Sequence, residues 1–103
     1  MKKRVIFDKV ARREFKRFDP HVQEDFDGYV FLLEKHGRLV FPDARKISSN
    51  LFEVRVEHNG AYRGFYAYVK GDFIVMLHFF QKKTQKTPQR NIETAVTRAK
   101  SYE

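Results

Sequence analysis

The sequence predicts an α+β domain in which helices pack on a mainly antiparallel, twisted sheet. Two observations predict this class: apolar residues recur at helical spacing in the N-terminal part of the chain, and they alternate at the strand period from 51 onward. The expected order of elements is β-α-α-β-β-β-α. At 103 residues and 42% hydrophobic composition, the chain can form one core, so we expect a single domain over 1–103.

The N-terminal part predicts a short strand followed by a helical hairpin. A strand at 5–7 ends at Asp8, a residue type that caps helix N-termini, and apolar residues at helical spacing follow it. Asp19 and Pro20 predict the start of a second helix, because aspartate caps and proline suits the first helical position. Gly37 predicts where that helix ends.

After the loop at 37–50, the spacing of apolar residues changes from the helical period to the alternation typical of strands. Alternating segments at 51–57 and 61–69 predict two strands, and the almost wholly apolar segment at 73–81 predicts a third strand that is covered on both faces. Pro88 then opens a last helix with one apolar face.

The loop between the first two of these strands decides which way Arg63 points. A two-residue turn would bury the Arg63 guanidinium among apolar side chains, at high cost in free energy. A three-residue loop over 58–60, with Gly60 in the left-handed conformation, pairs Glu57 with Ala61 instead. In this register one face carries Phe52, Val54, Val56, Tyr62, Tyr66 and Tyr68, and the other carries Glu53, Arg55, Glu57, Arg63 and Phe65.

That register also sets Arg55 directly across from Arg63, an unfavourable pairing of like charges. Two interpretations are open. Glu53 and Glu57, the diagonal neighbours, can neutralise both arginines in a solvated charge ladder. Alternatively, the two guanidinium groups can bind a phosphate, whose oxygens they grip in bidentate fashion.

Three lysines, Lys82, Lys83 and Lys86, follow the apolar strand and precede the last helix. Lysines at a sheet edge often only protect it from pairing. Here they sit beside the Arg63 strand and ahead of a helix N-terminus, where anions bind favourably. Phe65 and Phe80 offer flat rings for stacking, so a basic surface that binds single-stranded nucleic acid is the alternative.

Composition narrows the class of partner and site. A net charge of +8 favours a polyanion or an acidic protein. Basic residues of the first helix, Arg12 and Arg13 among them, form a solvated face by default and can also contact a nucleic-acid backbone. Four scattered histidines give no metal-ligand spacing, and His78 suits a hydrogen-bonded core position. The absence of Cys and of an apolar run of membrane-spanning length suits a cytoplasmic protein.

The segments "ARKISSNLFEVRVEHNGAYRGFYAYV" and "MLHFFQKKTQKTPQRNIETAVTRAKSYE" resemble the RelE/HigB/ParE superfamily of bacterial toxins, most closely its HigB-like, phage-associated branch. The resemblance implies a type II toxin that cleaves mRNA on the 70S ribosome and arrests growth. It implies no metal or other cofactor, attack by the ribose 2′-OH, and a 2′,3′-cyclic phosphate product. It also implies a cognate antitoxin, expected to be a helix-turn-helix protein like HigA, and no membrane partner.

The same resemblance implies roles for individual residues. Arg63 matches the family's strand arginine, which binds the phosphate and the transition state. Lys82 and Lys83 match the basic pair after the last strand, and Arg55 falls on a basic position of the preceding strand. Where RelE has a lysine on the first hairpin strand, this chain has Glu53, a carboxylate that can serve as general base.

Two other functions are compatible with these residues. A ParE-like protein on the same scaffold would inhibit DNA gyrase without cutting RNA. A plain nucleic-acid-binding module would bind with a strong salt dependence and leave cell growth unaffected.

Overall fold

The computed structural model describes residues 2–103. Its elements are β1 (Arg4–Phe7), α1 (Lys9–Lys16), α2 (Pro20–His36), β2 (Ala44–Ser48), β3 (Leu51–Glu57), β4 (Ala61–Val69), β5 (Phe73–Lys82), α3 (Gln89–Ala99) and the short 3₁₀ helix η1 (Lys100–Tyr102). The five strands form one sheet in the order β1-β5-β4-β3-β2. All neighbours are antiparallel except β1, which runs parallel to β5. The predicted α+β class and mainly antiparallel sheet are therefore confirmed.

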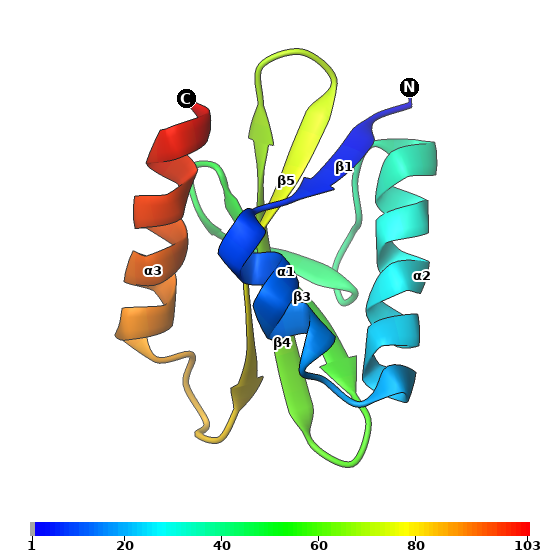
Figure 1. Ribbon diagram of the computed structural model, residues 1–103, viewed down its shortest axis with the longest axis vertical. Helices are drawn as coiled ribbons and strands as arrows, with labels where there is room; N and C mark the ends of the chain where they lie inside the picture. The colour runs from blue at the N-terminus through cyan, green and yellow to red at the C-terminus, as the bar shows by residue number, and fades with distance from the viewer. Residues whose placement is uncertain (1) are drawn as a thin grey trace.

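Helices cover both faces of the sheet, as Figure 1 shows, with α3 on one side and α1 and α2 on the other. Each face has its own core. Phe15 and Phe26 of α1 and α2 pack with Tyr66 and Phe79 on the first side. On the second side, Ala95 of α3 packs with a smaller apolar cluster from β3, β4 and β5. Strand β5, which lies between β1 and β4, is apolar throughout most of its length because both faces are covered.

The predicted helix ends are confirmed. Asp8 accepts hydrogen bonds from the backbone N–H groups of Val10 and Ala11, and Asp19 accepts one from His21. Gly37 ends α2 in the left-handed conformation, with a φ of 79° that favours glycine.

The register of the β3–β4 hairpin is confirmed as well: Glu57 pairs with Ala61, and Arg55 with Arg63. One detail of the loop differs from the expectation. Asn59 adopts the left-handed conformation (φ 52°), while Gly60 has a φ of 146°. Asparagine tolerates the left-handed region, so Asn59 can occupy it in the turn. Gly60 takes the more extended positive φ, which suits glycine.

Strand β2 lies inside the segment predicted as a loop. It is an edge strand that buries only Ala44 fully, and its pairing with β3 is interrupted by a shift between Lys46 and Ser48. Exposed basic side chains on a short, irregular edge strand give no alternating apolar pattern. Strand periodicity therefore could not reveal it.

A polar contact links α1, β5 and α3 beyond the end of β1. The backbone ladder between β1 and β5 stops near Asp8, and there the Glu14 carboxylate accepts a hydrogen bond from the Phe79 N–H (3.2 Å). Arg98 of α3 binds the same carboxylate through both terminal nitrogens, at 2.9 and 3.0 Å. His78 lies 3.0 Å from it through Nδ1. One carboxylate thus joins both helical layers to β5.

These bonds act on the pKa of Glu14. Burial alone would raise this pKa, but hydrogen bonds from His78, Arg98 and the Phe79 N–H outweigh it and lower the pKa to about 2. A carboxylate whose pKa is lower in the folded state than in the unfolded state stabilises the fold above its unfolded pKa. That stability is lost as pH falls toward the folded pKa.

We predict that Glu14→Gln removes an acid-sensitive part of the stability. The wild type should lose about 3 kcal/mol of unfolding free energy between pH 7 and pH 2 through this group, most of it by pH 3. Urea unfolding of Glu14→Gln should show a correspondingly flatter pH dependence. Glu24→Gln, on the exposed surface of α2, is the control and should follow the wild type. An identical pH dependence in wild type and Glu14→Gln would contradict the assignment.

Candidate functional site

The α3-facing side of β3, β4 and β5 carries charged residues near the hairpin end of the sheet. The strand registers place them in cross-strand rows, which read Glu57–Ala61–Lys82, Arg55–Arg63–Phe80 and Glu53–Phe65–His78. This end lies at the bottom of Figure 1, where β4 begins and β5 ends. Arg63, Lys82 and Glu57 thus come from three different strands and lie within two neighbouring rows.

Two adjacent cavities open over these rows. The first, here called the hairpin cavity, has a volume of about 580 Å³ and is lined by Glu57, Arg63, Lys82 and Lys83 among others. The second, here called the β2 cavity, also has a volume of about 580 Å³ and has a wall formed by β2. Its charged lining residues are Arg45, Lys46, Glu53, Arg55, Lys82 and Lys86. Arg55 and Lys82 line both cavities, so a continuous basic surface runs between them.

Arg63 is buried, with 3% of its side chain exposed. Its Nη1 donates to the Glu57 carboxylate (3.3 Å) and to the Tyr62 backbone oxygen (2.9 Å). Its Nε lies 3.8 Å from Glu53 and has no hydrogen-bond partner. A solvated charge ladder is therefore the wrong description of this residue, because the Arg63 side chain is buried and lies beside Glu53 and Glu57. It does point to the α3 side of the sheet, as the predicted register requires.

Glu53 is buried more deeply still, with 1% of its side chain exposed. Both of its oxygens are occupied: Arg45 donates to Oε1 at 3.2 Å, and the Thr87 hydroxyl donates to Oε2 at 2.9 Å. A buried carboxylate needs such partners. Glu53 consequently fastens edge strand β2 and the loop ahead of α3 to the middle of the sheet.

The three lysines divide between the cavities. Lys82, at the end of β5, is half-buried, and Lys83 beside it is exposed. Lys86 is exposed and lines the β2 cavity. Burial and the nearby Arg63 guanidinium lower the pKa of Lys82, with smaller effects of the same sign from Arg45 and Arg55, while Glu53 acts in the opposite direction. A lowered pKa makes the Lys82 ammonium a better proton donor.

The two aromatic side chains proposed for stacking differ in accessibility. Phe65 has 0% exposure, because it lies in the core beneath α3, so the proposed stacking surface is wrong for this ring. Phe80 is half-buried and stacks on His78 with 5.3 Å between ring centroids. His78 itself is buried between Glu14 and Asn91, which supports the prediction of a hydrogen-bonded core histidine.

The first helix does not contribute to either cavity. Helix α1 packs on the opposite side of the sheet, where the Arg12 guanidinium lies over the Phe7 ring at 4.5 Å. Neither Arg12 nor Arg13 lines the two cavities. These two residues are therefore not brought together with Arg63 and the lysines.

Sequence reasoning missed Arg45, Lys46 and Thr87. The two basic residues lie on β2, whose existence the periodicity did not reveal, and Arg45 stands opposite Glu53 in the β2–β3 register. Thr87 gave no signal beyond its place before Pro88. The clue available was the basic pair in "ARKIS", read together with an unmatched acidic residue on the neighbouring strand.

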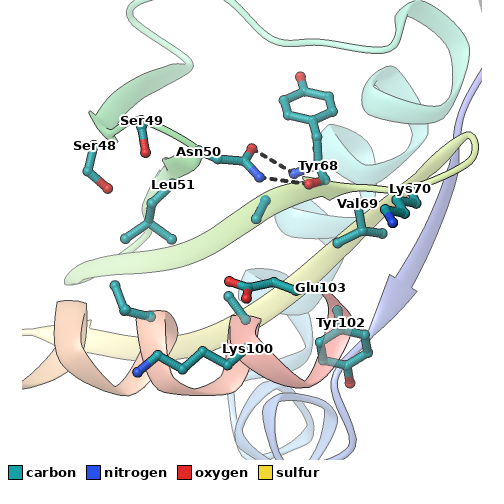
Figure 2. A pocket seen from close by; sticks show the side chains of 13 residues that line it. Ser48, Ser49, Asn50, Leu51, Tyr68, Val69, Lys70, Lys100, Tyr102 and Glu103 are labelled. Atoms are coloured by element: carbon teal, nitrogen blue, oxygen red, sulfur yellow. Dashed lines mark hydrogen bonds between the residues drawn. The ribbon is translucent and has the colours of Figure 1, made fainter.

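A third cavity, of about 680 Å³, lies at the other end of β4, roughly 25 Å along the strand from the hairpin. Figure 2 shows its walls: Ser48 to Leu51 on one side, Tyr68 to Lys70 along β4, and the C-terminal residues on the other side. Asn50 fixes the turn there, because its side chain bonds both the N–H and the carbonyl oxygen of Tyr68. Its mainly apolar walls contain none of the residues predicted to act on a phosphate.

Within residues 2–103, no three or more His, Cys, Asp and Glu side chains are grouped in a way that could hold a metal ion. None of the helices described there is long and apolar enough to span a bilayer.

The model of the family "Phage derived protein Gp49-like (DUF891)" matches residues 13–100, most of the chain. The chain belongs to this family. Its fold is that of the RelE toxin superfamily, as predicted from the sequence. No curated protein sequence matches the chain.

Several solved structures are similar to this chain in fold. A mutant of the E. coli toxin RelE in the free state superposes with a TM-score of 0.75 at 14% identity, over 95% of this chain and 98% of that one. The toxin–antitoxin complex RelBE of E. coli gives a TM-score of 0.65 at 13% identity, over 82% and 100%. RelBE2 from Mycobacterium tuberculosis gives 0.62 at 17% identity, over 80% and 100%. At these identities the superpositions concern the fold.

We predict that Thr87→Val loosens the loop that carries Lys83 and Lys86. The change removes the hydroxyl that donates to buried Glu53, which leaves one carboxylate oxygen without its partner. The expected loss of unfolding free energy is about 1–3 kcal/mol, measured by urea denaturation, with faster amide exchange in residues 83–88. Thr97→Val, at an exposed position of α3, is the control. Equal stability and equal exchange in both variants would contradict this role of Glu53.

Proposed function

We propose that the chain is the toxin of a type II toxin–antitoxin pair and that it cleaves mRNA on the ribosome without a metal ion. The observation that carries the proposal is the convergence of Arg63, Lys82 and Lys83 on one cavity in a RelE-type fold. Several cations around one small cavity suit a phosphodiester, whose charge they can neutralise.

In the proposed reaction, the ribose 2′-OH attacks the adjacent phosphorus in line with the departing 5′ oxygen. Arg63 binds the phosphate oxygens, and its buried position holds the guanidinium in a fixed orientation. Lys83 stabilises the charge that builds up on the phosphate, and Lys82 donates a proton to the leaving oxygen. Fixed cations aimed at developing charge are the largest source of catalysis in such sites. The products are a 2′,3′-cyclic phosphate and a 5′-OH.

Residues lining the β2 cavity extend the RNA-binding surface in this proposal. Arg55, shared by both cavities, and Lys86 would contact phosphates that flank the cleaved one. Half-buried Phe80 lines neither cavity and stacks on His78, so it would not take part in binding a base. Glu53 would organise the cations through its bonds to Arg45 and Thr87.

The proposed partners are mRNA, the 70S ribosome and a cognate antitoxin. Two of the matching structures are toxin–antitoxin complexes, which supports an antitoxin partner. The net charge of +8 favours a ribosomal RNA surface and an acidic inhibitor segment alike. A helix-turn-helix antitoxin like HigA and a cytoplasmic location complete the proposal.

The chemistry of the RNA ends tests the reaction. Brief induction in a bacterial host should stop growth and produce new mRNA 3′ ends that carry a cyclic phosphate, with 5′-OH ends downstream. The same mRNA incubated with purified protein but without ribosomes should remain largely intact. Ends with a 5′-phosphate, or arrest of growth with intact mRNA, would refute the nuclease. The second result would instead favour inhibition of gyrase.

Lys83→Ala tests the contribution of an exposed cation. We expect cleavage of ribosome-bound mRNA to slow roughly 10- to 100-fold, less than for loss of a buried oxyanion donor, because water partly screens Lys83. The fold should not change, since the side chain is exposed. Lys70→Ala removes an exposed lysine at the far end of β4 and should cleave like the wild type. Equal rates for the two variants would remove Lys83 from the site.

A further inference from the structure

The hairpin cavity contains one group that can accept a proton at neutral pH. Of the described residues lining it, Glu57 is the one carboxylate, and none is a histidine. The carboxylate has 65% of its side chain exposed and lies 3.3 Å from the Arg63 guanidinium. Glu53 offers no such access, since its exposure is 1% and its two oxygens are bonded to Arg45 and Thr87. The accessible carboxylate beside Arg63 is therefore Glu57.

The cross-strand row places Glu57 opposite a candidate acid. Glu57 on β3 pairs with Ala61 on β4, and Ala61 pairs with Lys82 on β5. Glu57 and Lys82 are thus two strands apart, about 10 Å between their backbones, with only a methyl group between them. Arg63 occupies the next row of the same strand as Ala61. A phosphate bound by Arg63 over Ala61 would have a carboxylate on one side and an ammonium group on the other.

In-line displacement requires this polarity, because the attacking and leaving oxygens lie on opposite sides of phosphorus. We propose that Glu57 is the general base of the cleavage reaction, acting on the ribose 2′-OH from the side opposite Lys82. This inference rests on the proposed function and names a residue that sequence reasoning did not select, in place of Glu53.

The step balances without any further reactant. The Glu57 carboxylate takes the 2′-OH proton while the 2′ oxygen forms its bond to phosphorus. The bond from phosphorus to the 5′ oxygen breaks, and its electron pair stays on that oxygen, which takes a proton from the Lys82 ammonium. Glu57 then releases its proton to water, and Lys82 regains one from water.

The same geometry assigns Glu53 a positioning role. It binds Arg45 and Thr87 and lies 3.8 Å from the Arg63 Nε, so it fixes the cations without touching the substrate. Two carboxylates on one sheet face thereby serve different purposes, decided by their burial.

Glu57→Gln separates proton transfer from binding. The amide keeps the size of the side chain but cannot accept the proton, so single-turnover cleavage of ribosome-bound mRNA should slow by about 100-fold or more. Binding to the programmed ribosome should be unchanged or tighter, because a negative charge leaves the basic cavity. Glu24→Gln, an exposed acid on α2, is the matched control and should behave as the wild type. A wild-type rate in Glu57→Gln, or a slower rate explained by weaker binding, would overturn the inference.

The Glu57→His variant tests proton transfer through the pH dependence of its cleavage rate, which a purely structural role of residue 57 would not change. Histidine has an ordinary pKa near 6.5, so this variant should cleave faster than Glu57→Gln at pH 8 and lose that advantage as the pH falls through about 6.5. The charged and titratable groups around the position are Arg55, Arg63, Lys82, Lys83 and the adjacent His58, with Asp25 and Tyr29 of α2 on the other side. If Glu57→His and Glu57→Gln were equally slow at every pH, Glu57 would not be the base.

These outcomes are distinguishable from failure of the proposed function. A wild-type chain that leaves ribosome-bound mRNA intact would refute the nuclease itself, and the base with it. A wild-type chain that cuts mRNA, together with a fully active Glu57→Gln variant, would refute the base alone.

Discussion

A buried carboxylate makes the charged surface of this protein possible. Arg45, Arg55, Arg63 and Lys82 lie around Glu53, and their mutual repulsion would disfavour the folded state without a nearby negative charge. Glu53 supplies that charge where water has been excluded, and its own desolvation is offset by bonds to Arg45 and Thr87. Glu53 thus holds the buried side of the cluster together, while the exposed Glu57 carboxylate pairs with Arg63 at the hairpin cavity.

A second carboxylate, Glu14, holds α1, β5 and α3 together. Strand β1 stops pairing with β5 before Phe79 is reached. The Glu14 carboxylate accepts the hydrogen bond of the Phe79 N–H in place of a β1 carbonyl oxygen. By binding Arg98 at the same time, it fixes α3 against the sheet, although α3 buries only Ala95 fully. The position of α3 determines the position of the loop before it, and hence of Lys83 and Lys86. Glu14 therefore acts on the β1–β5 side of the sheet, and Glu53 on the β3–β2 side.

The sequence was sufficient for features that depend on local pattern. Helix ends at Asp8, Asp19 and Gly37 follow from capping chemistry, and the hairpin register follows from the cost of placing Arg63 among apolar side chains. The register in turn brought Arg63 to the side of the sheet where Lys82 and Lys83 emerge. Each of these inferences needed only residues close together in the chain or paired across one turn.

Features that depend on distant segments could not be predicted. The burial of Phe65 requires knowing that α3 covers that part of the sheet, and Arg98 and Glu14 meet across 84 positions of sequence. Strand β2 lacks an apolar pattern because it is an edge with solvent on one side. The contrast between Glu53 and Glu57 has the same origin. The two side chains share a face of β3, but Glu53 alone is bonded to Arg45 of β2 and to Thr87 of the loop before α3, and Glu57 stays exposed.

The basic residues that line the two cavities come from four different strands, and this affects when the basic surface can form. Arg45, Arg55, Arg63 and Lys82 belong to β2, β3, β4 and β5 in turn, and the sheet order brings them together only after every one of these strands has paired. No short fragment of the chain contains the assembled cluster. During synthesis the basic surface can therefore form only once the C-terminal half of the chain has left the ribosome that makes it.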